Sequence, residues 1–176
     1  MRRFLVILVC SLAAAPVALA GSRATGDGVL ELKAVYGKVT IGKTSAQPAR
    51  GLLWGQMDSG KLTVEDPVPG DGRILVSGYD TKTYTAADTI NGTPAQTTYA
   101  GTNMHFRVTG GKYRLIFRGA GIDLTAIGAG TAYLDASENA VDAGYYAVDS
   151  GEWISAPLGV VKSVPFGTQT PPPASP

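Results

Sequence analysis

The apolar residues of this chain recur at intervals that predict β-strands. The clearest stretch is residues 110–135, in which three apolar runs are separated by the tripeptides Gly119-Ala-Gly121 and Gly128-Ala-Gly130. A strand signal therefore returns about every nine residues, which leaves no room for helices between the strands. In the first run Tyr113 and Leu115 alternate with basic residues, as expected for a strand with one buried face. Bends and bulges are expected beside the glycines.

The same period of two predicts further strands. Strand character is found at residues 29–36, 38–41, 51–57, 60–64, 74–79, 104–109, 145–148, 152–154 and 160–166. Residues 65–73 carry the strongest turn signal, and residues 80–98 indicate a long excursion or a weak edge hairpin. No stretch has a helical period longer than about two turns. The sequence therefore predicts an all-β fold, a single-domain antiparallel β-sandwich or irregular barrel.

A short repeat leaves one alternative fold open. Residues 37–41 (GKVTI) return almost unchanged as residues 60–64 (GKLTV), 23 residues later, and residues 111–115 (GKYRL) are a looser copy. Repeats of this length occur in β-solenoids, but at least three are normally needed for a stable array. A short β-solenoid is therefore the alternative, and recurring hairpin chemistry is the preferred explanation.

The N-terminus has the features of a secretory signal peptide. Arg2 and Arg3 precede an uncharged apolar stretch, and Ala18-Leu-Ala20 forms an A-x-A cleavage pattern. We expect residues 1–20 to be removed, residues 21–28 to form a flexible leader, residues 29–166 to form the all-β domain, and residues 167–176 to be a disordered Pro-rich tail. The expected localisation is secreted or extracytoplasmic, with no membrane span after signal removal.

Cysteine and charge content narrow the class of partner. The one cysteine, Cys10, lies in the signal peptide, so the mature domain has no disulfide and must rest on its hydrophobic core. An exported chain without disulfides fits a bacterial envelope or medium. Without Arg2 and Arg3, 13 of the 15 basic residues remain against 14 acidic ones, which gives no electrostatic footprint for nucleic acid. The expected partner is an unknown extracellular or envelope molecule, and the oligomeric state stays open.

One nucleotide-binding motif matches by its letters only. Residues 37–44 (GKVTIGKT) fit the phosphate-loop pattern G-x-x-x-x-G-K-[ST]. That loop must be followed by a helix, whereas Val39, Thr40 and Ile41 favour extended geometry and Pro48 follows closely. We expect a strand and a turn there.

Few residue types remain for catalysis. His105 is the one histidine, and alternation makes it a solvated strand residue. A histidine-rich zinc site and a cysteine nucleophile are excluded, so a hydrolase would use two carboxylates about 5 to 10 Å apart. The candidates, among which the spacing selects no pair, are Asp58, Glu65, Asp66, Asp71, Asp80, Asp123, Asp135, Glu138, Asp142, Asp149 and Glu152.

No cofactor is expected. The weak alternative is a surface calcium ion held by Asp66, Asp71 or the loop that begins at Asp135. Oxygen-bearing side chains alternate in that loop, but Ala140 and Tyr146 stand where a calcium loop has its glycine and its bidentate glutamate.

Aromatic residues are the best candidates for ligand binding. Tyr145, Tyr146 and Trp153 flank a predicted hairpin and could line a carbohydrate or peptide groove. Core packing explains Trp54 about as well as ligand binding does.

Residues 51–66 and 110–135 resemble segments of uncharacterised exported proteins of actinobacterial type. The resemblance implies export and an all-β fold, and it carries no catalytic residue to transfer. We therefore expect an exported non-catalytic envelope or extracellular β module that acts through surface binding or structural contacts. The alternatives are a carbohydrate-active or other hydrolase using two carboxylates and, third, a self-assembling β scaffold.

Overall fold

The structure, a computed structural model, describes residues 24–90, 92–136 and 143–168. The strands are β1 (Gly28–Ile41), β2 (Ala49–Glu65), β3 (Ile74–Thr85), β4 (Gln96–Ala136), β5 (Tyr145–Val148), β6 (Ile154–Ser155) and β7 (Lys162–Phe166). The predicted all-β class is confirmed. The expected signal peptide and most of the Pro-rich tail lie outside the described residues. Within the described ranges no helix is long and apolar enough to span a bilayer.

The seven strands of the described chain form one antiparallel sheet that is not closed into a barrel. As residue numbers rise along β1 from Gly28 to Ile41, those of the partners on β4 fall from Gly128 to Leu115. β2 pairs with β4 in the same opposed sense, β3 and β7 also pair with β4, and β5 lies between β1 and β6. The irregular barrel and the parallel-stacked solenoid are therefore wrong, and the arrangement is sandwich-like.

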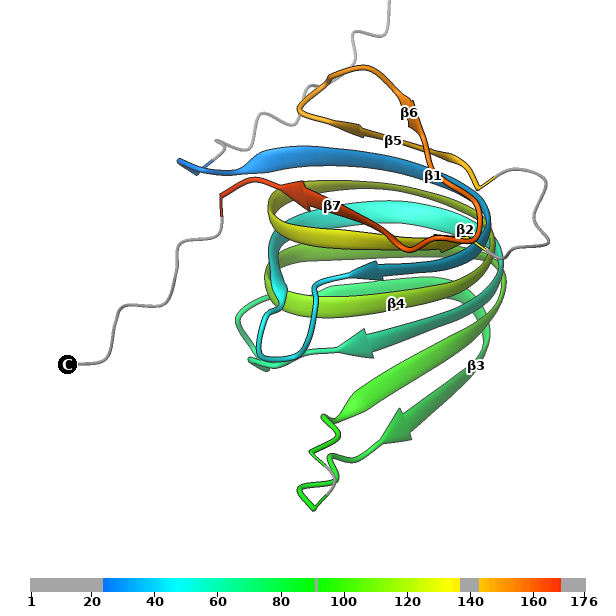
Figure 1. Ribbon diagram of the computed structural model, residues 1–176. Helices are drawn as coiled ribbons and strands as arrows, with labels where there is room; N and C mark the ends of the chain where they lie inside the picture. The colour runs from blue at the N-terminus through cyan, green and yellow to red at the C-terminus, as the bar shows by residue number, and fades with distance from the viewer. Residues whose placement is uncertain (1–23, 91, 137–142, 169–176) are drawn as a thin grey trace, which may run out of the picture.

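β4 is a single 41-residue strand that winds around the molecule as a flattened coil (Figure 1). Leu53 of β2 pairs with Val108 on one side and, on the other, with Ala126, 18 residues further along β4. Val39 of β1 lies in the same way between Phe117 and Leu134, which are 17 residues apart. Each circuit of β4 therefore takes 17 or 18 residues, and β2 and β1 occupy the spaces between successive circuits.

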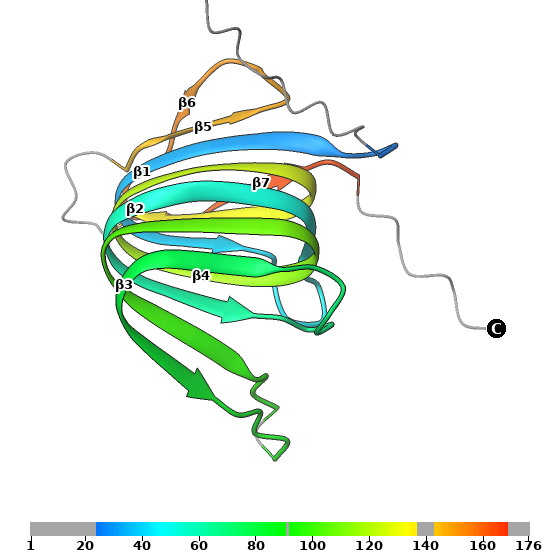
Figure 2. The ribbon, with the colours of Figure 1, turned by 180° about the vertical axis from the view of Figure 1, so that it is seen from behind.

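The coil has two layers because β1 and β2 each bend once and β4 bends at the end of every half-circuit. The front layer comprises residues 37–41, 59–65, 96–102, 113–119 and 131–136, and the back layer comprises residues 28–36, 49–57, 104–109 and 121–129 (Figures 1 and 2). The buried positions change phase at the bend: in β1 they are Leu30, Leu32 and Ala34, then Val39 and Ile41. The hydrophobic core fills the space between the layers, as in a sandwich.

Glycines mark the corners of the coil. β4 has one every nine residues, at Gly101, Gly110, Gly119 and Gly128, so each stands at the end of a half-circuit. Gly37 of β1 and Gly60 of β2 both pair with Gly119, and Gly60 also pairs with Gly101. Four glycines thus lie side by side at one corner. The sequence repeat of GKVTI and GKLTV has a structural counterpart. In β1 and in β2 the repeat begins with the corner glycine and continues as an equivalent segment of the front layer.

The bends at the glycines also change several predicted strand boundaries. The apolar runs at residues 104–109, 112–118, 122–127 and 131–135 are parts of β4, because the glycines bend this strand without ending it. Residues 80–98 contribute to the two arms of the β3–β4 hairpin, which projects beyond the coil (Figure 1). The edge-hairpin interpretation of this segment is therefore right, and the long excursion is wrong.

Tyr113 places a hydroxyl group inside the hydrophobic core. Tyr113 is fully buried, and its hydroxyl makes no hydrogen bond within the described residues. Burial raises the pKa of this phenol, because the charged form would lose its hydration.

The variant Tyr113→Phe should therefore stabilise the domain by about 1 kcal/mol at neutral pH, because it removes an unsatisfied buried hydroxyl and keeps the ring. Urea denaturation measures the change. In the parent, stability should fall as pH rises above about 10, the pKa of tyrosine in an unfolded chain, since the raised pKa leaves the folded chain protonated while the unfolded chain loses the proton. The variant should lack this part of the alkaline loss. A less stable variant at neutral pH would instead indicate a bound water on the hydroxyl.

Candidate functional site

A hollow of about 830 Å³ lies on the outer face of the back layer. Its floor is the outward side of β2, where Leu52, Trp54 and Gln56 occupy every second position. Trp54 is 42% exposed, so core packing does not account for it. We call this hollow the Trp54 groove.

Antiparallel pairing places polar side chains beside this floor. Trp54 lies opposite Arg107 on one neighbouring pass of β4. Gln56 lies between His105 on that pass and Asp123 on the next one. Residues directly opposite each other in a sheet point to the same face. The groove therefore combines an apolar and aromatic floor with hydrogen-bonding groups on both sides.

Two of the three aromatic residues predicted to bind a ligand lie on the same face. Tyr145 pairs with Lys33, and Lys33 pairs with Asp123 of the groove, so the three form a row across the sheet. The ring of Trp153 lies 5.7 Å from Lys33 Nζ. Tyr145 and Trp153 are 43% and 47% exposed, respectively. They extend the aromatic surface beyond the groove.

Tyr146, the third of these residues, points into the core. It is 6% exposed and pairs with the buried Leu32, because neighbouring residues of a strand face opposite sides of the sheet. Tyr146 is therefore not available to a surface ligand, which corrects its assignment as a candidate binding residue.

The acidic groups of the groove each have a cationic neighbour. Arg50 Nη1 donates to Asp27 Oδ1 at 2.7 Å, and the Ala24 backbone N–H donates to Asp27 Oδ2 at 3.1 Å. Lys33 Nζ lies 3.7 Å from Asp123 Oδ2, and both side chains are about half exposed. Because the carboxylates are offset in this way, the groove suits a neutral polar ligand better than a cation.

The two carboxylates that line the groove are too far apart for a glycosidase pair. Asp27 directly precedes Gly28, which pairs with Gly128, whereas Asp123 lies five residues away from Gly128 along β4. At the rise of a β-strand this separates the two positions by roughly 16 Å. The carboxyl groups of a glycosidase lie about 5 to 10 Å apart.

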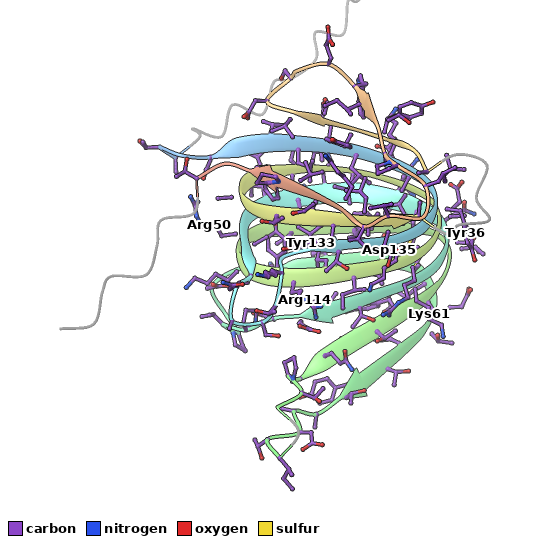
Figure 3. The ribbon with its side chains drawn as sticks, viewed as in Figure 1. Tyr36, Arg50, Lys61, Arg114, Tyr133 and Asp135 are labelled. Carbon is purple, nitrogen blue, oxygen red and sulfur yellow. The ribbon has the colours of Figure 1, made fainter. Side chains whose placement is uncertain are left out.

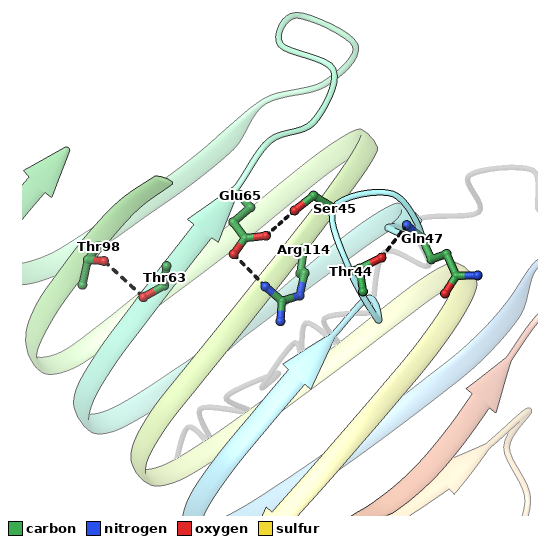
Figure 4. Close-up of polar contacts among 7 residues, drawn as sticks. All are labelled: Thr44, Ser45, Gln47, Thr63, Glu65, Thr98 and Arg114. Carbon is green, nitrogen blue, oxygen red and sulfur yellow. Dashed lines mark hydrogen bonds and ion pairs between the residues drawn. The ribbon is translucent and has the colours of Figure 1, made fainter. Parts of the chain in front are cut away.

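Glu65, another predicted catalytic candidate, belongs to a buried ion pair. Its side chain is 6% exposed. Oε1 accepts from Arg114 Nη1 at 2.6 Å, and Oε2 accepts from Ser45 Oγ at 2.7 Å (Figure 4). Glu65 thus ties the connection between β1 and β2 to β4, and both of its oxygens are engaged in that structural role.

Asp66 and Asp71, the candidates for a surface calcium site, accept hydrogen bonds from backbone N–H groups. Asp66 Oδ1 accepts from the Val68 backbone N–H at 3.2 Å, and Asp71 Oδ2 accepts from that of Lys112 at 2.9 Å. Burial raises the pKa of Asp66 and the charge of Asp71 adds to this, while the hydrogen bond from Val68 acts in the opposite direction. Within the described ranges no three His, Cys, Asp or Glu side chains gather as a metal site. Most of the loop after Asp135 lies outside those ranges.

Sequence reasoning identified some of the groove residues and missed others. It placed His105 on the outer face, where the structure has it, and the same alternation places Arg107 there. No local signal marks Asp27, which the sequence assigned to a leader. No family model, curated protein or solved structure matches the chain. The functional inference therefore rests on the chemistry of these surfaces.

Proposed function

We propose that the protein is an exported, non-catalytic β module that binds a neutral carbohydrate through the Trp54 groove. The observation that supports this is the set of groups in the groove: an exposed indole on the floor beside an amide, an imidazole, a guanidinium and a carboxylate. The face of an indole stacks on the apolar C–H face of a sugar ring, while sugar hydroxyls need both donors and acceptors. The signal-peptide pattern of residues 1–20 supports export.

The size and surroundings of the groove favour an oligosaccharide over a single sugar. Its volume of about 830 Å³ falls within the range of about 300–1,000 Å³ typical of small-molecule sites. The row from Gln56 through Asp123 and Lys33 leads to Tyr145, three strand spacings or about 14 Å away. A longer glycan lying across the strands would therefore meet a second aromatic surface.

Trp54→Ala should lower the affinity for an oligosaccharide at least about tenfold, equivalent to about 1.4 kcal/mol, because the stacking surface is lost. The measurement is calorimetric titration of the secreted chain with soluble β-1,4-linked oligomers of glucose and of N-acetylglucosamine. Tyr84→Ala is the matched control, since Tyr84 is 68% exposed and lies on β3, outside the groove. It should leave the affinity unchanged.

Product analysis of the same mixtures separates the proposal from the hydrolase alternative. Binding without new reducing ends supports a non-catalytic module. New reducing ends that depend on a carboxylate would favour a hydrolase. Equal affinities of parent and Trp54→Ala, or no binding to either oligomer series, would contradict a carbohydrate site in this groove.

The exposed edge of β3 supports the scaffold as a second candidate. Among the described strands β3 pairs with β4 alone, and nearly all of its residues are exposed. An uncovered edge can pair with a second copy, although the register shifts between Ser77 and Thr81 interrupt its straight course. A particle mass that rises with concentration in light scattering would favour the scaffold, and a constant mass would count against it.

A further inference from the structure

We infer a second binding site, for an oxyanion of the phosphate class, on the outer face of the front layer. A cavity of about 220 Å³ lies there, away from the Trp54 groove, and its polar lining residues are Lys38, Thr40, Lys43, Arg114, Tyr133 and Asp135. Figure 3 shows Arg114, Tyr133 and Asp135 on one side of the sheet. Because a water molecule occupies about 30 Å³ in the liquid, the cavity can hold a tetrahedral oxyanion and several waters.

The lining offers more hydrogen-bond donors than acceptors. Lys38, Lys43 and Arg114 are cations, and the hydroxyls of Thr40 and Tyr133 can also donate. Among the described lining residues Asp135 is the one carboxylate, and it pairs in register with Lys38. With Glu65, the carboxylate that is paired with Arg114, the site holds three cations and two carboxylates and keeps an excess of one positive charge.

Arg114 supplies an independent observation that points to a ligand. Its Nη1 donates to Glu65, but its Nε is buried and has no hydrogen-bond acceptor within the described chain. A buried donor without an acceptor is unfavourable. The guanidinium group binds oxyanions through pairs of N–H groups, so a phosphate in the cavity could supply the missing acceptor.

A row of cations continues from the cavity across the front layer. Lys38 pairs with Arg118, and Arg118 pairs with Lys61 on the next strand. Like charges directly opposite each other destabilise a sheet, and an anion lying over them would relieve the repulsion. A free phosphate would use the cavity alone, whereas a polymer of phosphates would also follow this row.

The test is an NMR titration of the secreted chain with inorganic phosphate at low ionic strength. Lys38→Gln and Lys43→Gln should each weaken binding at least about fivefold, because each removes a charge from the lining. The matched control is Lys82→Gln, an identical change on the projecting β3 strand, which should alter the affinity less than about twofold. The shifted amides should centre on Thr40 and Tyr133.

A second titration with short linear polyphosphate distinguishes the two sources of the anion. The site is assigned to a phosphate polymer if polyphosphate binds more tightly than inorganic phosphate and if Lys61→Gln weakens the binding of polyphosphate. The same variant should leave the affinity for inorganic phosphate unchanged. Polyphosphate affinity no higher than that for inorganic phosphate assigns it to a free oxyanion. The site would be overturned if phosphate showed no saturable binding up to about 10 mM, which would mean an affinity weaker than millimolar. Equal losses of affinity in Lys38→Gln, Lys43→Gln and Lys82→Gln would also overturn it.

Discussion

Replacing Gly60 with alanine should destabilise the fold by about 3 kcal/mol or more, a loss large enough to unfold a marginally stable domain. Gly60 has a φ of +136° at the corner where β2 passes from the back layer to the front layer. A Cβ at this position would overlap the carbonyl oxygen of Arg118 and lie 2.7 Å from the Cα of Gly119. Both are backbone atoms of β4, so the clash cannot be relieved by rotating a side chain.

Gly110→Ala separates this clash from the cost of the backbone angle. Gly110 has a similar φ of +127°, but a Cβ built there has no heavy atom of the described residues within 4 Å beyond Gly110 itself and its two chain neighbours. Its loss should be about 1–2 kcal/mol, the usual conformational cost for an L-residue. Urea denaturation of the two variants in parallel measures the difference. Equal losses would show that close approach of the strands does not determine which residues the corner accepts.

The sequence predicted the strands better than it predicted their connection into a coil. A period of two is a local property of extended backbone, and it located the buried face of β1 and most segments of β4. Which strands lie side by side depends on contacts between distant residues. The available signal was the glycine spacing, nine residues between Gly28 and Gly37, between Gly51 and Gly60, and throughout residues 101–128. Without Pro, Asn-Gly or Asp-Gly in residues 101–136, such glycines bend a strand more readily than they end it.

The Trp54 groove was harder to predict than the strands. Leu52, Leu53 and Trp54 are consecutive apolar residues, so alternation alone does not decide which of them face the core. The structure resolves this, with Leu53 buried and its two neighbours outward. The groove also needs His105 and Asp123, which come from two passes of β4 and meet Gln56 only through the sheet register. Tyr145 and Trp153 could be proposed earlier because a hairpin brings them together locally.

Replacing Glu65 with methionine should destabilise the domain by about 2–3 kcal/mol, near the lower end expected for breaking a buried ion pair. Methionine keeps the length and approximate volume of the side chain, but it removes the acceptors of Arg114 Nη1 and Ser45 Oγ. Arg114 would then hold a mostly buried charge without its carboxylate. The side chain of Arg114 is 23% exposed, so water can reach part of it, and this limits the loss. Urea denaturation measures it.

The double variant Glu65→Met and Arg114→Met tests whether the loss comes from the uncompensated charge. Removing both charges exchanges the ion pair for apolar packing, which is often close to neutral, so the double variant should be more stable than Glu65→Met alone. Arg114→Met alone completes a double-mutant cycle, in which the coupling free energy is the loss of the double variant minus the sum of the two single losses. If the loss of the double variant equals the sum of the two single losses, the ion pair is not the source of the stability. The effect of Glu65→Met would then come from the lost hydrogen bond with Ser45. A strong coupling would mean that Glu65 holds the Arg114 side chain in place, leaving Nε as the donor for an anion in the adjacent cavity.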